Sequence, residues 1–201
     1  LYLFEVMRVL AALSSLALAC GQIAGYAGFS SQLSGNVKIG WNIHATSVDF
    51  VFQGPTGANG WVGFGFQDPS TQSVMVGDAV VGTVSGGVVT VKAYKLTTTV
   101  APNTEISAGY FTSANGTVDA GVATVHFSRS IAAVGTGLAL NPAASVQYHA
   151  SYGSSAWPAQ HDQRARFSIS LASPAPTAAA QPSSASAIQA VFLMPLVLAL
   201  F

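Results

Sequence analysis

The chain has 201 residues and very little charge: seven Lys and Arg balance seven Asp and Glu, so the net charge is zero. Charged residues make up 7% of the chain, against about 25% in ordinary soluble domains. A nucleic-acid-binding protein that works through a basic patch is therefore excluded, because no excess of cations is available to neutralise phosphates. The single cysteine also excludes a disulfide framework and a cysteine-rich zinc site.

The N-terminal region predicts a secretory signal peptide. Arg8 precedes an uncharged apolar run over residues 9–19, which is shorter than the roughly 20 residues of a membrane-spanning helix. Cleavage is expected between Ala19 and Ala27 and would remove Cys20, so we assign residues 1–27 to the signal-peptide region. A bacterial lipoprotein lipidated at Cys20 is the alternative, although the residues before it match a lipobox poorly.

The C-terminal region predicts a second processing signal. Residues 174–187 form an uncharged Ser/Ala/Pro-rich linker, and residues 188–201 form a hydrophobic tail. Small residues, a spacer and a terminal apolar tail are typical of a GPI-attachment signal. A C-terminal tail anchor is the alternative. With the signal peptide, this pattern predicts passage through the secretory pathway to the extracellular face of the plasma membrane, and Asn115 is the expected glycosylation site.

Between these ends, residues 28–173 alternate apolar and polar side chains as β-strands do. Ser-Gly-Gly, Asn-Gly-Thr and Asn-Pro sequences are expected to form turns between the strands. No segment carries a convincing helical period. The pattern predicts one all-β domain, an antiparallel sandwich or barrel, with strands over 37–43, 48–52, 61–66, 88–94, 106–110, 122–127, 146–149 and 167–171.

Residues able to perform chemistry are scarce. The sequence has no paired carboxylates for glycoside hydrolysis and no GxSxG, HExxH or CxxCH motif. A self-sufficient enzyme is therefore the least favoured interpretation, and no catalytic residue is assigned. Met75 is the only methionine between the two terminal segments, and His161 lies in a loop before the last strand. Taken alone, a methionine near a strand is usually core filler and a loop histidine is usually solvated; together, the two could hold a haem iron between loops.

Several blocks of the sequence resemble the DOMON domain family, over roughly Leu33–Leu171 and in the family's order. The most specific is GWVGFGF (60–66) followed by MVGDAVVG (75–82). The chain is most similar to the cytochrome type, which includes the auxin-induced GPI-anchored b-type cytochromes of plants and the haem domain of fungal cellobiose dehydrogenase. The resemblance implies an immunoglobulin-like β-sandwich.

It also implies a cofactor site. Met75 and His161 match the two axial ligands of the haem iron in the cytochrome type. Without CxxCH, the cofactor would be haem b, held non-covalently. Aromatic residues in or near the matching blocks are candidate pocket walls, and a basic residue of the last block could pair with a haem propionate; these are Trp61, Phe64, Phe66, Trp157, Arg164 and Arg166.

The chain departs from the family on its penultimate strand. Where the family often has an aliphatic-Trp-Ala-Tyr-Gly run, this chain has residues 146–153, VQYHASYG. His149 thus takes an aromatic position and is a rival ligand.

Axial Met and His ligands would fill both open positions of the iron, which favours electron transfer over oxygen activation. We therefore expect an extracellular, membrane-anchored b-type cytochrome that relays single electrons and is not itself an enzyme. Its partner would be a redox protein or a small carrier such as ascorbate or a quinone. A haem-free DOMON module that binds a sugar or another cell-surface ligand is the alternative, and an adhesion or wall-associated protein is a third interpretation.

Overall fold

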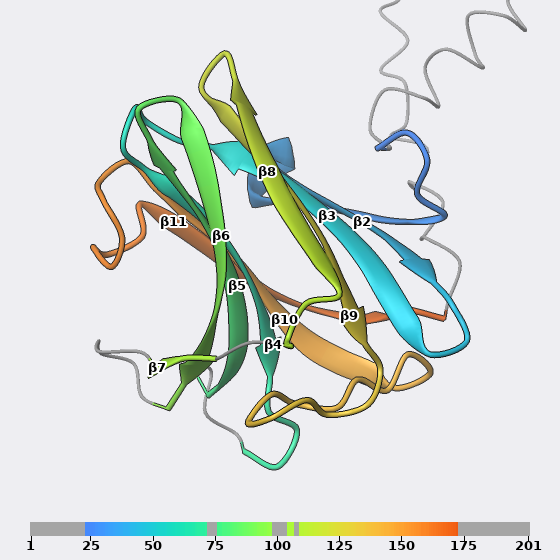
Figure 1. Ribbon diagram of the computed structural model, residues 1–201. Helices are drawn as coiled ribbons and strands as arrows, with labels where there is room; N and C mark the ends of the chain where they lie inside the picture. The colour runs from blue at the N-terminus through green and yellow to red at the C-terminus, as the bar shows by residue number, and fades with distance from the viewer. Residues whose placement is uncertain (1–22, 72–75, 98–103, 107–108, 173–201) are drawn as a thin grey trace, which may run out of the picture.

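Two antiparallel sheets pack face to face in the computed structural model, which describes residues 23–71, 76–97, 104–106 and 109–172 (Figure 1). The expected immunoglobulin-like β-sandwich is confirmed. The first sheet has the order β1-β2-β3-β9-β8 and consists of β1 (Gly28–Gln32), β2 (Val37–Ile43), β3 (Ser47–Pro55), β9 (Val122–Ser130) and β8 (Ser113–Asp119). The second has the order β11-β10-β4-β5-β6-β7 and consists of β11 (Gln163–Ser170), β10 (Ser145–Gly153), β4 (Trp61–Gln67), β5 (Gly77–Ser85), β6 (Val88–Leu96) and β7 (Thr104–Glu105).

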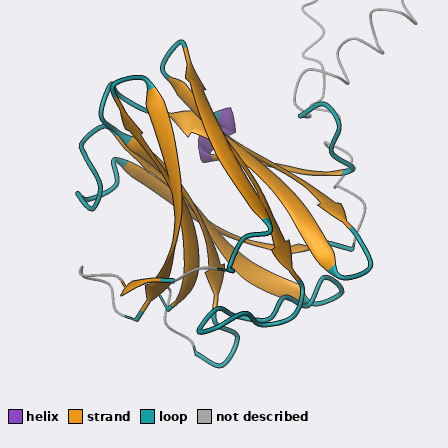
Figure 2. Ribbon diagram, viewed as in Figure 1, coloured by secondary structure: helices purple, strands orange, loops and turns teal. Residues whose placement is uncertain are grey.

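Helical structure in the described residues is limited to η1, a single 3-10 turn over Leu33–Gly35 (Figure 2). Within the same residues, no helix is both long and apolar enough to cross a membrane.

Two local expectations are wrong. The Asn-Gly-Thr sequence does not form a turn but lies inside β8, where Asn115 pairs with His126 and Gly116 with Val125. A glycine is needed there because β6 passes close by: a Cβ on Gly116 would lie 2.5 Å from Val89 Cγ1. The strand expected over 106–110 is also absent from the described part of that segment. The short β7 precedes it, and Tyr110 is buried outside any strand.

Strand β4 is buried along its whole length, so both of its faces are covered. Val62, Phe64 and Phe66 point into the core between the sheets, where Phe66 packs against Phe50 at 5.5 Å between ring centroids. Trp61 belongs instead to a second apolar cluster, on the outer face of the second sheet. The alternation of large residues and glycine in WVGFGF therefore builds the core with one face and leaves space beyond the other.

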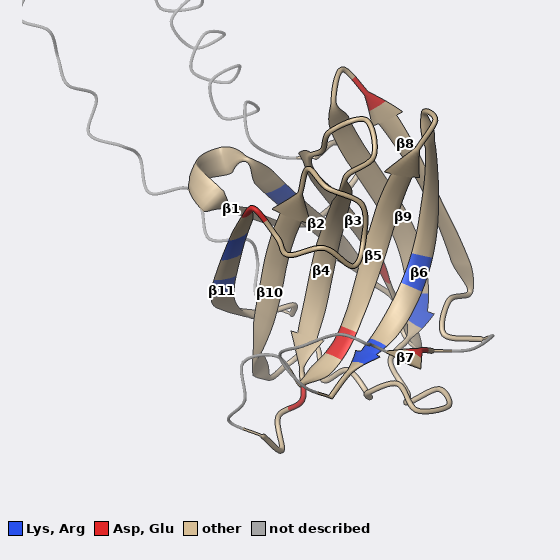
Figure 3. Cartoon of the chain, turned by 90° about the vertical axis from the view of Figure 1, so that its left-hand side faces the viewer, with Lys and Arg blue, Asp and Glu red and all other residues tan. Residues whose placement is uncertain are grey.

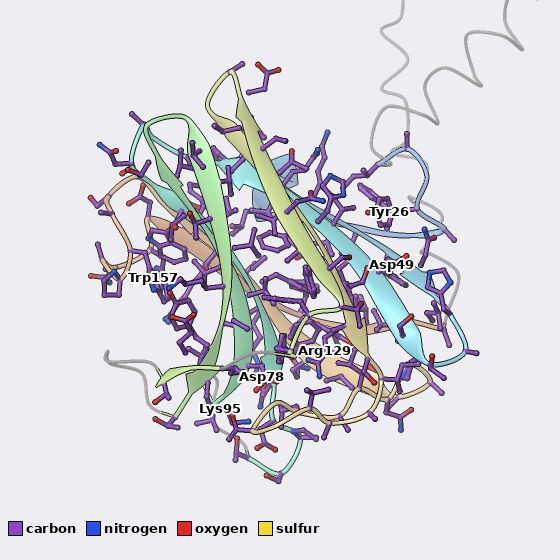
Figure 4. All side chains as sticks on the ribbon, in the orientation of Figure 1. Tyr26, Asp49, Asp78, Lys95, Arg129 and Trp157 are labelled. Atoms are coloured by element: carbon purple, nitrogen blue, oxygen red, sulfur yellow. The ribbon has the colours of Figure 1, made fainter. Side chains whose placement is uncertain are left out.

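A buried ion cluster joins the two sheets at one end of the sandwich (Figure 4). Asp78 of β5 is fully buried, and its Oδ2 accepts hydrogen bonds from the Leu138 backbone N–H at 2.7 Å and the Tyr110 hydroxyl at 3.2 Å. Lys95 Nζ lies 3.1 Å from Oδ1, and Arg129 of β9 in the opposite sheet lies 3.6 Å from Oδ2. The cluster satisfies a carboxylate that the core would otherwise leave uncompensated.

The Arg129 guanidinium has its own set of partners. It donates hydrogen bonds to the Tyr110 hydroxyl and to the Leu138 carbonyl oxygen. Its Cζ also lies 4.4 Å from the centre of the Tyr110 ring and 5.3 Å from that of Phe66. Burial raises the pKa of the Tyr110 hydroxyl, so the phenol stays protonated and can donate to Asp78.

Replacing Arg129 with methionine should lower the free energy of unfolding by about 3–5 kcal/mol, because breaking a buried pair strands one of its charges. Denaturant unfolding of the purified protein measures the change. Lys92→Gln is the matched control, since it breaks an exposed ion pair with Glu105 and should leave the unfolding midpoint unchanged. Equal effects of the two changes would contradict a structural role for the buried cluster.

Candidate functional site

The outer face of the second sheet carries a cavity of about 480 Å³, covered by the loop between β10 and β11. Figure 3 shows this loop crossing in front of β4 and β5. The floor is made of small residues, which are Gly63 and Gly65 on β4 and Ala79 and Val81 on β5. The roof is residues 157–161. A sheet face that would usually be open to water is thus enclosed as a ligand-sized space.

Strand register explains the shape of the cavity. Gly65 pairs with His149 of β10 on one side and with Ala79 of β5 on the other. Across these three strands, a large side chain is therefore followed by a position without a side chain and then by a small one. A Cβ on Gly65 would lie only 3.4 Å from His149 Cβ, so the base of the imidazole side chain lies against the glycine. A Cβ on Gly63 would likewise lie 3.2 Å from Trp61 Cζ3. Because Gly63 and Gly65 have no side chains, the floor of the cavity lies deeper at these positions than at the neighbouring Trp61 and His149.

Aromatic side chains close one side of the cavity. The Trp61 and Trp157 rings meet edge to face with centroids 4.8 Å apart, and Tyr94 lies 5.3 Å from Trp157. Figure 4 shows Trp157 on the outer side of the second sheet, away from the core. Trp61 Nε1 is buried and has no hydrogen-bond partner in the described structure. This side of the cavity is therefore aromatic, and Trp61 Nε1 is its one buried donor without a partner in the described structure.

His149 supplies a second buried nitrogen to the lining of the cavity. Its Nε2 is buried without a hydrogen-bond partner in the described structure, and the residue lines the same cavity. Burial lowers the pKa of His149 from 6.5 to about 4, with smaller contributions from the positive charges of Arg166 and Arg164. The imidazole is consequently neutral at pH 7. An unpaired buried polar atom is costly, so a group that pairs with it on binding would gain affinity.

The structure brings most of the sequence-predicted site residues together. Trp61, Trp157, His161 and Arg164 line this cavity. Phe64 borders it as well, although its side chain points into the core between the sheets. His161 is half-buried in the roof, and Arg164 lies on the neighbouring strand β11.

Two predicted residues have other positions, and a third is not among the described residues. Phe66 does not line the cavity and packs in the core between the sheets. Arg166 donates to the side-chain oxygens of Gln67 and Gln147, both of which line a separate cavity of about 370 Å³. Met75 lies outside the described residues.

Asn115 is exposed on β8, which forms one edge of the first sheet. No group of three or more His, Cys, Asp and Glu side chains in the described residues could hold a metal ion.

Sequence reasoning missed Ala79, Val81 and Ser151 as lining residues. The signal for the cavity was present in the glycines that face away from the phenylalanines of β4. Ala79 and Val81 could be found only by pairing β5 with β4, which places them beside Gly65 and Gly63.

Comparisons with known proteins agree with this fold. A model of the DOMON domain matches residues 33–152. The cytochrome b domain of pyranose dehydrogenase from Coprinopsis cinerea superimposes with a TM-score of 0.55 at 16% identity, over 74% of this chain and 84% of its own. The cytochrome domain of Myriococcum thermophilum cellobiose dehydrogenase gives a TM-score of 0.50 at 14% identity, over 77% and 84%. No curated protein matches the chain. At these identities the likeness establishes a cytochrome-like fold.

The depressed pKa of His149 makes stability depend on pH. Because the folded value is about 4 and the unfolded value 6.5, the unfolded state binds a proton more readily, and stability is lost as pH falls from 6.5 to 4. After allowance for the partial exposure of the ring, the loss is about 2 kcal/mol. His149→Phe should therefore lose less stability than the wild type between pH 7 and pH 4, as measured by denaturant unfolding at each pH. Parallel losses would contradict the burial of this imidazole.

Proposed function

Because this chain belongs to the DOMON domain family and has a cytochrome-like fold, we propose that its outer-face cavity binds haem b and that the protein carries single electrons outside the cell. The observation that carries the proposal is the convergence of His161, Trp61, Trp157 and Arg164 on one cavity with a low glycine floor.

The residues of the cavity fit a porphyrin. Its floor and aromatic side offer apolar surface to a flat macrocycle, and Arg164 offers a positive charge to a carboxylate. Two buried nitrogens, Trp61 Nε1 and His149 Nε2, have no partner in the described structure, and both residues line the cavity. The sequence has no CxxCH motif, so binding would be non-covalent.

Haem iron supplies a one-electron redox couple when bound. In the proposal, His161 of the roof and Met75 would be the two residues that hold the iron. Trp61, Trp157 and Leu96 line the cavity and exclude water from it. An iron held by two protein ligands would leave no place for substrate or oxygen to bind it, which is why we propose electron transfer and not oxygen activation.

The terminal segments place this activity at the membrane in the proposal. A signal peptide and a GPI-attachment signal would leave the sandwich on the outer leaflet of the plasma membrane. The electron partner would be a redox protein or a small carrier such as ascorbate or a quinone. The exposure of Asn115 on an edge strand is compatible with a glycan there.

The purified protein should show a low-spin haem spectrum, and both Met75→Ala and His161→Ala should abolish it, because each would remove an axial ligand. Optical spectra of the oxidised and reduced protein measure this. His44→Ala is the control: it removes a histidine that bonds to Asp49 at 2.7 Å and does not line the cavity, and it should leave the spectrum unchanged. A domain that stays colourless after reconstitution with haem would refute the proposal. Glycan-array binding by such a haem-free domain would favour the sugar-binding alternative.

Membrane attachment has a separate test. Cells that express the whole chain should display the sandwich on their surface and release it on treatment with a phosphatidylinositol-specific phospholipase C, because the enzyme cuts the lipid from a GPI anchor. A chain that ends at residue 173 should be secreted without treatment. Surface protein that resists the phospholipase would instead indicate a tail anchor.

A further inference from the structure

His149 is a feature of the cavity that the proposed iron ligation does not explain. Its Nε2 is a buried nitrogen without a hydrogen-bond partner in the described structure, and the residue lines the site. A phenyl or indole ring would cover the floor equally well without an unpaired imidazole nitrogen. The imidazole therefore needs a partner, and within the described structure the cavity is where a partner can bind.

The charges around His149 indicate what that partner is. His149 pairs across the sheet with Arg166, and Ser151, two residues further along β10, pairs with Arg164. Both guanidinium groups disfavour a positive charge on the imidazole, and Arg164 lines the cavity itself. A neutral imidazole carries one N–H and can donate it. A buried N–H donor beside fixed positive charges attracts an anionic oxygen and repels a cation.

We propose that His149 Nε2 donates a hydrogen bond to a carboxylate of the bound porphyrin, with Arg164 supplying the balancing charge. This inference rests on the proposed function, since it assumes a porphyrin in the cavity. It assigns His149 to recognition of the cofactor's acidic edge and leaves the iron to other residues. His149 and Arg164 would then distinguish haem from a porphyrin without free carboxylates.

Iron-free protoporphyrin IX tests the contact without any axial ligation. Fluorescence titration of the haem-stripped protein would compare the free acid with its dimethyl ester, in which both carboxylates are blocked. His149→Phe should weaken binding of the free acid by about tenfold to a hundredfold and leave the affinity for the ester unchanged. Arg164→Gln should act in the same direction, and His149→Gln, which keeps an N–H donor, should restore part of the loss.

Matched controls lie outside the cavity. His126→Phe removes a half-buried histidine of the first sheet, and Lys92→Gln removes one positive charge from the outer side of the second sheet. Both should leave the preference for the free acid unchanged.

Equal weakening of acid and ester in His149→Phe would overturn the inference by showing a role in shape alone. A change from a low-spin to a high-spin spectrum in the haem-loaded His149→Phe protein would overturn it in favour of an iron ligand. A wild-type protein that binds no haem refutes the proposed function. If the wild-type protein binds haem in low-spin form but His149→Phe does not change the preference for the free acid over the ester, this inference alone is refuted.

Discussion

The carboxylate of Asp78 is the constraint on which the rest of the sandwich depends. It is fully buried between two sheets. It accepts hydrogen bonds from a backbone N–H, a phenol and the Lys95 ammonium, and it forms an ion pair with Arg129 of the opposite sheet. Such a group is tolerable in a core only when all of these donors are in place, so it specifies one way of stacking the sheets. It also fixes the start of β5, because Asp78 pairs with Phe66 and Gly77 with Gln67.

Strand β4 contributes to both the core and the floor of the cavity. Its phenylalanines fill the core on one side, where Phe64 stacks on Tyr148 with centroids 5.5 Å apart, and its glycines leave a hollow on the other. The loop from β10 to β11 covers the hollow, and its Trp157 packs on Trp61 from the same strand. Core and cavity thus share one strand, which gives the cavity a floor as rigid as the core behind it.

Much of this could be predicted from sequence. Alternation of apolar and polar residues located β2, β3, β4, β6, β9, β10 and β11, since each has one face in the core. The same reasoning failed for β8 because its side chains are mostly exposed and Asn-Gly-Thr has the composition of a turn. Tyr110 was assigned to a strand for its β propensity, whereas its position follows from the polar contact with Asp78. Local pattern carries no information on such a long-range bond, nor on the pairing that puts Ala79 beside Gly65.

The low charge of the chain acquires a structural meaning in the fold. Of the few ionic groups, Asp78 and Arg129 are buried inside the sandwich, and Lys95 forms an ion pair with Asp78. Arg166 is held by two glutamine side chains, which leaves Arg164 as the cationic side chain that lines the cavity. A molecule with few ions and no net charge generates little long-range field, so charge steering contributes little to bringing a partner to this site. Recognition here must depend on contact at close range, where the shape of the cavity, its aromatic side and the few donors around it determine what binds.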